Sequence, residues 1–209
     1  MEVHRIEQPG AGTLAVFALG WAADHRFVEH IRPAGCSVMT ISDYRELSAV
    51  GTGDYEHKYL FAWSFGVWAA ERLFAGVEFE KAVALCGSPL PADDRHGLGL
   101  RRMKLTLRSI EGGMEEFYRR SMGEAYSRFE PLLPVRDPKA CADELSALIE
   151  ASAQPYTPAI RWDAAIVGER DVIFPQANLL NYWGSRAEIR PLPHYPFAEA
   201  TAIEEWIKR

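Results

Sequence analysis

Residues 59–70 read YLFAWSFGVWAA, an apolar run that leads through a serine into a helical pattern. This order of strand, sharp turn and helix is typical of a nucleophile elbow, in which a strained turn exposes the serine hydroxyl. Strand and helix approach closely at such a turn, so the residues two before and two after the serine must be small. Ala62 and Gly66 meet this requirement around Ser64. The alternative is a helix N-cap serine that follows a strand without any catalytic role.

Short apolar or β-branched runs predict six strands, and their continuity indicates that both faces of the sheet are buried. These runs cover residues 14–19, 37–41, 59–63, 82–86, 164–167 and 187–192. Helical patterns lie between several of them, over residues 65–75 and 175–183, and a last helix is predicted over residues 198–208. The alternation predicts an α/β fold, a mostly parallel sheet with helices on both faces.

Residues 93–152 interrupt the alternation, because their pattern is helical and contains no strand candidate. Within this stretch, Asp137 followed by Pro138 predicts the start of a helix, with aspartate as the N-cap and proline in the first turn. We expect the stretch to form a small helical insertion, or lid, in a single domain that spans residues 1–209.

The composition is that of a soluble globular protein, since 48% of the 209 residues are hydrophobic and 25% are charged. Cys36, Cys86 and Cys141 are odd in number and widely spaced, which argues against a disulfide framework and against a zinc site. The longest nearly apolar run, residues 13–23, is too short to cross a bilayer. The first residues, MEVH, lack the pattern of a secretory signal. We therefore expect a cytoplasmic protein.

The charge is distributed unevenly along the chain. With 23 basic and 29 acidic residues the net charge is −6, which disfavours nucleic acid and anionic membranes as partners. Residues 95–120 nevertheless contain seven basic and three acidic side chains, a local charge of +4. A basic patch on an acidic protein indicates a specific acidic partner. The alternative is a solvated helix face with local salt bridges.

An elbow serine needs a histidine base and an orienting acid further along the chain, in the order Ser, Asp, His. Asp171 lies in a loop after the fifth predicted strand, and His194 lies in a proline-bracketed loop after the sixth. Two other acids are less suitable. Asp163 precedes a strand and so lies at the wrong end of a parallel sheet, and Asp43 precedes Ser64 in the chain.

An oxyanion hole in such a site uses the backbone N–H after the nucleophile and another from the loop after an early strand. Here those groups belong to Phe65 and Trp21, and Gly20 allows the early loop to turn. A plain strand-to-helix turn is the alternative for that loop. No spacing of histidine and cysteine residues indicates a metal site.

These residues resemble a known family, the BioG-type pimeloyl-[acyl-carrier protein] methyl ester esterases, which are α/β-hydrolases of biotin synthesis. The matching stretches are Gly20-Trp21 with Asp24, Asp43-Tyr44-Arg45, residues 62–70, Gly87-Ser88-Pro89 with Pro91, residues 119–123, Asp171 with residues 173–175, and residues 194–197. They are spread over the whole chain. The resemblance implies an α/β-hydrolase fold and removal of the methyl group from pimeloyl-ACP methyl ester, which yields pimeloyl-ACP and methanol.

The resemblance also implies that Ser64 is the nucleophile, His194 the base and Asp171 the orienting acid, without a metal or organic cofactor. The partner that the resemblance implies is an acidic acyl-carrier protein, and the basic residues expected to dock it are Arg101, Lys104, Arg108, Arg119 and Arg120. Two other functions stay open at this point. One is a small carboxylesterase or thioesterase that acts on free acyl esters, and the other is a non-catalytic binding protein with a hydrolase fold.

Overall fold

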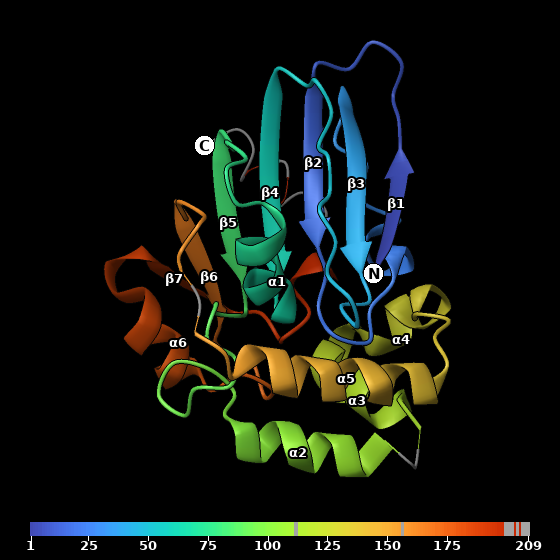
Figure 1. Cartoon of the computed structure of the whole chain (residues 1–209). Coiled ribbons are helices and arrows are strands. Elements are labelled where there is room, and N and C mark those ends of the chain that lie inside the picture. Colours follow the sequence, from blue (N-terminus) through green and yellow to red (C-terminus); the bar gives the residue numbers. More distant parts are fainter. Residues whose placement is uncertain (111–112, 156, 199–202, 204, 206–209) are drawn as a thin grey trace.

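A seven-stranded sheet forms the centre of the molecule (Figure 1). The computed structural model describes residues 1–110, 113–155, 157–198, 203 and 205. The strands are β1 (Glu2–Ile6), β2 (Thr13–Ala18), β3 (Cys36–Ser42), β4 (His57–Trp63), β5 (Lys81–Leu85), β6 (Ala164–Gly168) and β7 (Ala187–Arg190). Their order across the sheet is β1-β3-β2-β4-β5-β6-β7. The mostly parallel α/β sheet predicted from the sequence is therefore confirmed.

Strands β2 to β7 pair in parallel, and their central members are buried on both faces. Burial explains why continuous apolar runs identified the central strands, and β7, a mostly half-buried strand at the other edge, was identified as well. Strand β1 was missed. It pairs with β3 in the antiparallel direction at the edge of the sheet, and its side chains are exposed or half-buried. An edge strand of this kind lacks the apolar run that marks a buried strand.

Helices α1 (Phe65–Leu73) and α6 (Gln176–Trp183) follow strands β4 and β6, as the helical patterns predicted. Helix α1 packs against β2 and β4, and α6 packs against β6 and β7. Short 3-10 helices occupy His25–Val28, Gly123–Ala125, Glu130–Leu132, Gly184–Arg186 and Pro196–Ala198. The helix predicted over residues 198–208 lies almost entirely outside the described residues.

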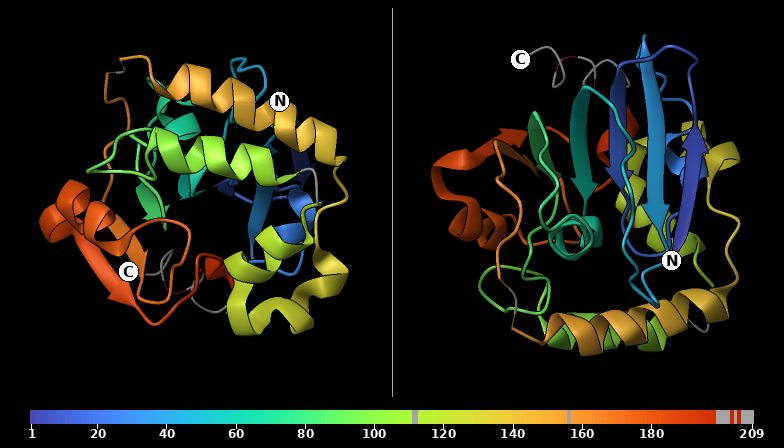
Figure 2. Two further views of the ribbon diagram at one scale, coloured as in Figure 1. Left: turned by 90° about the horizontal axis from the view of Figure 1, so that it is seen from below. Right: turned by 45° about the horizontal axis from the view of Figure 1, so that its top comes forward.

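Four helices lie across the carboxyl ends of the parallel strands, below the sheet in Figure 1. They are α2 (Leu100–Ser109), α3 (Glu115–Met122), α4 (Tyr126–Phe129) and α5 (Pro138–Ser152). We call residues 100–152 the helical segment. Helices α2 and α5 pack side by side, as the view from below in Figure 2 shows. Asp137 caps α5, because its carboxylate accepts hydrogen bonds from the N–H groups of Lys139 and Ala140 at 2.7 and 3.1 Å.

The carboxylate of Glu71 ties α1 to the chain that enters β6. Glu71 is buried, and its oxygens accept hydrogen bonds from the N–H groups of Ala159 at 2.6 Å and Ile160 at 3.0 Å. The indole N–H of Trp162 is a third donor, at 2.7 Å. Three donors satisfy the hydrogen bonding of this buried carboxylate, and its removal leaves buried N–H groups without partners.

We expect Glu71→Gln to lower the free energy of unfolding by about 1–3 kcal/mol, because the amide nitrogen cannot accept a hydrogen bond from a buried donor. Urea denaturation measures the change. Glu78→Gln, which alters an exposed glutamate, is the matched control and should shift the free energy by less than about 0.5 kcal/mol. Equal stability of the two variants would show that the Glu71 contacts contribute nothing.

Candidate active site

The carboxyl edge of the sheet concentrates unusual backbone conformations. Ala22, Asp43, Ser64 and Cys86 have φ angles of 61°, 59°, 57° and 48°, in the left-handed region that residues other than glycine rarely adopt. Three of these residues directly follow β3, β4 and β5, and Ala22 lies in the loop after β2. Each such residue costs of the order of 1–3 kcal/mol and persists only where its surroundings hold it, which is a common property of functional sites.

Ser64 stands in the sharp turn between β4 and α1, as the elbow pattern predicted. The turn depends on close backbone contacts. A Cβ atom on Gly66 would lie 2.0 Å from the carbonyl oxygen of Ala18, and one on Gly87 would lie 2.4 Å from the carbonyl oxygen of Ser64. Both glycines are therefore required. The role of Gly66 followed from its spacing, whereas that of Gly87 depends on packing between β4 and β5.

Ser64, His194 and Asp171 form a continuous chain of hydrogen bonds. The distance from His194 Nε2 to Ser64 Oγ is 3.0 Å, and the distance from His194 Nδ1 to Asp171 Oδ2 is 2.8 Å. A carboxylate only accepts hydrogen bonds, so Nδ1 carries the proton and Nε2 is free to accept one from the serine. The side chains of His194 and Asp171 are 1% and 0% exposed. The structure thus brings the three predicted residues together.

The other oxygen of Asp171 is held by the backbone. It accepts hydrogen bonds from the N–H groups of Ile173 at 2.7 Å and Phe174 at 2.9 Å. The Phe174 ring lies parallel to the His194 ring, with 5.7 Å between centroids. The indole N–H of Trp63 donates to the carbonyl oxygen of His194 at 2.7 Å. Sequence reasoning did not find these roles of Trp63 and Phe174, although both residues lie in stretches that it had identified.

The two rival acids are engaged elsewhere. Asp43 accepts a hydrogen bond from Arg45 at 2.7 Å and lies 3.4 Å from Arg136. Burial would raise the pKa of Asp43, but these two guanidinium groups bring it below its ordinary value. The carboxylate of Asp163 accepts a hydrogen bond from the N–H of Ala82 at 2.9 Å, at the amino end of β5.

The two residues expected to supply oxyanion-hole N–H groups lie beside Ser64. Trp21 and Phe65 both line the same cavity as the serine. Gly20 brings the early loop into contact with the elbow, since a Cβ atom there would lie 3.1 Å from Ser64 Cβ and 3.2 Å from the Trp63 ring. The loop therefore rests directly on the nucleophile turn.

This cavity has a volume of about 520 Å³ and lies between the sheet edge and the helical segment. Its apolar lining comes mainly from the helices. The lining residues include Leu98, Met103, Leu105, Ile110, Met114, Phe117, Leu145, Val172 and Ile173. Two arginines, Arg102 and Arg120, also line it, together with Glu116. The arrangement suits a largely apolar ligand that also carries polar groups.

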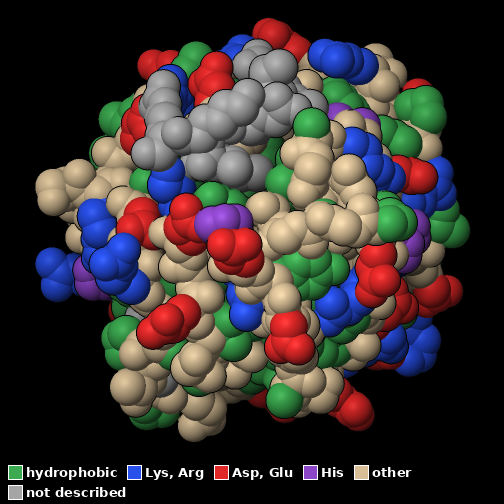
Figure 3. Space-filling model, turned by 90° about the horizontal axis from the view of Figure 1, so that it is seen from above, with side chains coloured by type: hydrophobic (Ala, Val, Ile, Leu, Met, Phe, Trp, Pro, Cys, Tyr) green, Lys and Arg blue, Asp and Glu red, His purple; other side chains and the backbone are tan. Residues whose placement is uncertain are grey.

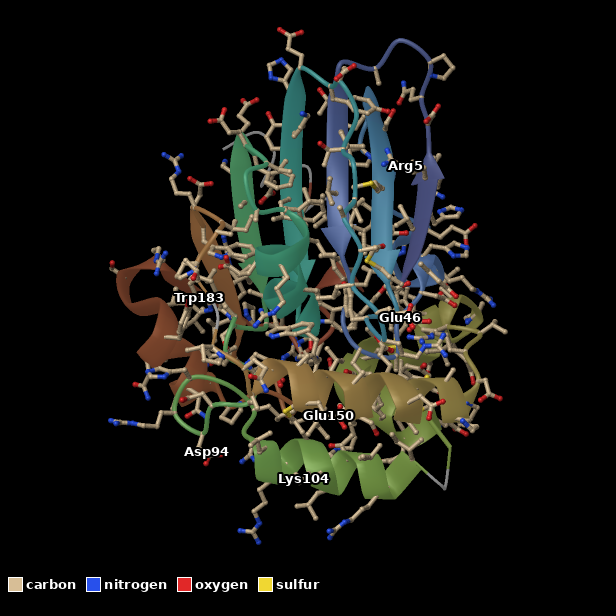
Figure 4. The ribbon with its side chains drawn as sticks, in the orientation of Figure 1. Arg5, Glu46, Asp94, Lys104, Glu150 and Trp183 are labelled. Atoms are coloured by element: carbon tan, nitrogen blue, oxygen red, sulfur yellow. The ribbon has the colours of Figure 1, made fainter. Side chains whose placement is uncertain are left out.

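The five basic residues predicted to dock a carrier are all exposed, but their contacts differ. Arg101, Lys104 and Arg108 are exposed on α2, the helix on which Figure 4 labels Lys104. Arg119 pairs with Glu115 at 2.6 Å and stacks on the ring of Tyr126. Arg120 lines the cavity. Arg102, which sequence reasoning did not select, lines the cavity as well.

The described residues at the end of the molecule opposite the helical segment show no separate basic or acidic patch in the view of Figure 3. Figure 3 views this end from above and shows acidic and basic side chains intermixed around the atoms that are not described. In the described part of the chain, no group of three or more histidine, cysteine or acidic side chains could hold a metal ion. None of the described helices is long and apolar enough to cross a membrane.

Cys86 is an inert neighbour of the site. Its thiol is fully buried and lies 3.8 Å from the carbonyl oxygen of Pro193, beneath the histidine loop. Burial, reinforced by the negative charge of Asp171, raises the pKa of Cys86 well above its ordinary value. The thiol therefore stays neutral and is a poor nucleophile. Cys36 and Cys141 are also free of disulfides.

Comparisons with known proteins show which family the chain resembles. The crystal structure of BioG from Haemophilus influenzae matches with a TM-score of 0.86 and 32% identity, over 95% of each chain. A curated protein of the same species, described only as uncharacterized, is 33% identical over 196 residues, which cover 90% of this chain and 91% of that protein. The enol-lactonase from Burkholderia xenovorans has a TM-score of 0.66 at 14% identity, a likeness of fold alone, over 99% of this chain and 96% of that one.

Acyl-carrier protein appears in the name of another relative. A malonyl-[acyl-carrier protein] O-methyltransferase from Bacteroides fragilis is 30% identical over 175 residues, which cover 80% of this chain but 36% of that protein. The family model of the pimeloyl-ACP methyl esterase BioG matches residues 1–205. With a match over nearly its whole length, the chain belongs to the BioG family of α/β-hydrolase esterases.

Proposed function

We propose that this protein hydrolyses the methyl ester of pimeloyl-ACP and releases pimeloyl-ACP and methanol in biotin synthesis. The observation that carries the proposal is the hydrogen-bonded chain of Ser64, His194 and Asp171, with the serine facing an apolar cavity of about 520 Å³ in a member of the BioG family. The lack of a disulfide at Cys36, Cys86 and Cys141 and the carrier-bound substrate both support a cytoplasmic enzyme.

The first half of the reaction makes an acyl-enzyme. Ser64 Oγ attacks the ester carbonyl carbon while His194 Nε2 takes the serine proton, and the carbonyl electrons move to oxygen. The N–H groups of Trp21 and Phe65 stabilise that oxyanion. Asp171 keeps the imidazole in the tautomer that accepts at Nε2 and stabilises the imidazolium. When the C–O bond to the methoxy group breaks, His194 returns the proton and methanol leaves.

Water completes the cycle by the same path. His194 accepts a proton from the water as its oxygen attacks the acyl-enzyme carbonyl, and a second oxyanion forms in the same place. Ser64 then leaves with the proton from the imidazolium. The product carries a free carboxylate at the distal end of the pimeloyl chain, and its other end remains on the carrier. These steps need no metal and no organic cofactor.

The helical segment would serve as a lid that receives the carrier. Acyl-carrier proteins are acidic, and α2 presents Arg101, Lys104 and Arg108 to solvent. Arg102 and Arg120 belong to the cavity wall and suit the anionic part of the carrier's prosthetic arm. The arm would enter beside them and present the distal ester to Ser64. Ser64 would then attack the ester rather than the thioester, because the ester lies at the far end of the acyl chain and the thioester stays near the carrier.

The test of this function compares two substrates. We expect methanol release from carrier-bound methyl pimelate to have a kcat/KM at least about tenfold above that for free dimethyl pimelate, because carrier docking adds binding energy. Added salt should reduce the rate on the carrier-bound ester and leave the free ester almost unaffected. A higher rate on the free ester would identify a small carboxylesterase instead.

Charge reversal on α2 should weaken carrier docking selectively. The triple variant Arg101→Glu, Lys104→Glu and Arg108→Glu should raise the KM for the carrier-bound ester about tenfold or more and change turnover of a small ester by less than about twofold. Steady-state kinetics on both substrates measure this. Equal losses on the two esters would mean that the helix only supports the site, and unchanged kinetics would leave these charges as a solvated face.

Asp171→Asn should keep the fold and reduce kcat by about 10⁴, because an asparagine amide favours the wrong histidine tautomer, as in serine proteases. Ser64→Ala gives the background rate of ester hydrolysis without the nucleophile. Asp163→Asn is the matched control, since that carboxylate binds the Ala82 N–H far from His194, and it should leave kcat within about twofold. If Asp43→Asn caused the larger fall in single-turnover acylation, the orienting acid would instead be Asp43.

A further inference from the structure

The loop that carries Trp21 is anchored by the helical segment. We call residues 20–24 the oxyanion loop. The indole N–H of Trp21 donates to the carbonyl oxygen of Cys141 at 2.7 Å, and the hydroxyl of Tyr118 donates to the carbonyl oxygen of Ala22 at 2.8 Å. The carboxylate of Asp24 accepts a hydrogen bond from the N–H of Val135 at 2.9 Å. Helices α3 and α5 and the chain before α5 therefore all contact this loop.

Glu144 on α5 makes the contact that fixes the backbone of the loop. Its side chain is 0% exposed. Oε2 accepts a hydrogen bond from the N–H of Ala22 at 3.2 Å, and Oε1 accepts one from the N–H of Tyr44 at 3.0 Å. Ala22 is itself left-handed, and Tyr44 follows the left-handed Asp43. One carboxylate thus holds two of the four strained turns at the sheet edge.

Arg136 neutralises this carboxylate. Its side chain is 6% exposed, Nη1 forms an ion pair with Glu144, and the same nitrogen lies 3.4 Å from the carbonyl oxygen of Ala23. Nη2 lies 3.4 Å from the carboxylate of Asp43. A buried ion pair gains little stability over an apolar pair of the same volume, because both charges lose their water. A requirement for fixed geometry explains the pair better than stability does.

We propose that Glu144, held by Arg136, is a positioning residue for the oxyanion hole. The peptide N–H of Trp21 lies one residue before the N–H that Glu144 binds, and the Trp21 side chain is tied to Cys141 on the same helix. These two contacts set the direction of the Trp21 N–H relative to Ser64. Glu144 does not touch the substrate. The inference rests on the proposed ester hydrolysis at Ser64 and is independent of the carrier.

The test uses Glu144→Gln with a small ester, p-nitrophenyl butyrate, and an alkyl trifluoromethyl ketone, which forms a tetrahedral adduct with an active serine. We expect kcat/KM to fall about 10- to 100-fold, since loss of a whole oxyanion donor costs about 10²- to 10³-fold and a misaimed donor costs less. The affinity for the ketone should fall by a similar factor, because its oxyanion occupies the same hole. The KM should change less than about threefold.

Glu71→Gln is the matched control, since Glu71 is also a buried helical glutamate that accepts two backbone N–H groups. It should lower the melting temperature yet keep kcat/KM and ketone affinity within about twofold. If Glu144→Gln fails to fold, Tyr118→Phe replaces it. This variant removes only the hydrogen bond to the Ala22 carbonyl, and both quantities should fall about three- to tenfold.

Three results would overturn the inference. The first is a Glu144→Gln or Tyr118→Phe enzyme whose kcat/KM and ketone affinity stay within twofold of the parent. The second is a fall in kcat/KM and ketone affinity in Glu71→Gln that equals the fall in Glu144→Gln when the two variants have lost the same stability. The third is a fall in kcat/KM without any fall in ketone affinity. The proposed substrate is tested separately. It would be wrong if the parent enzyme turned over p-nitrophenyl butyrate but not the carrier-bound ester.

Discussion

The close approach of three backbone segments around Ser64 is the constraint on which the rest of the structure depends. The start of α1 touches the end of β2 through Gly66, and the turn after β5 touches the serine through Gly87, with no room for a Cβ atom at either position. The left-handed turn at Ser64 is possible only because these contacts are made. The hydroxyl then meets His194 at 3.0 Å, and Trp63, the residue before it, holds the histidine loop by its indole N–H.

The sheet and the helical segment contribute different parts of the site. The sheet edge supplies the serine, and the loops after β6 and β7 supply Asp171 and His194. The helices supply most of the cavity wall, and they also contact the oxyanion loop, in which Ala22 is left-handed. Helix α5 therefore contributes both to substrate binding and to catalytic geometry. It lines the cavity through Leu145, and the neighbouring residue Glu144 binds the Ala22 N–H.

Much of this was predictable from the sequence, and the failures share a physical cause. Buried strands and the nucleophile elbow have local sequence patterns, so six strands and the turn at Ser64 could be identified. Strand β1 could not, because edge pairing leaves its residues exposed. Gly87 packs against Ser64, 23 residues away in the chain, and Glu144 binds the N–H groups of Tyr44 and Ala22, which lie 100 and 122 residues away. A glutamate in a helix normally indicates a solvated face, and only the rotation of α5 against two distant loops turns Glu144 inward. Arg101 and Arg102 are both exposed on α2, and of the two only Arg102 also lines the cavity.

The central claim is that Ser64 attacks the distal ester of a carrier-bound chain, and the mass of the acyl-enzyme tests it most directly. Attack on the methyl ester releases methanol and leaves Ser64 joined through the pimeloyl chain to the whole carrier. Attack on the thioester instead frees the carrier thiol and leaves only a methyl pimeloyl group on the serine. Rapid acid quenching of the enzyme with pimeloyl-ACP methyl ester, followed by intact-protein mass spectrometry, distinguishes the two. Our account predicts the covalent complex of enzyme and carrier, absent in Ser64→Ala. A methyl pimeloyl adduct, or methanol release without any adduct in single-turnover samples, would contradict it.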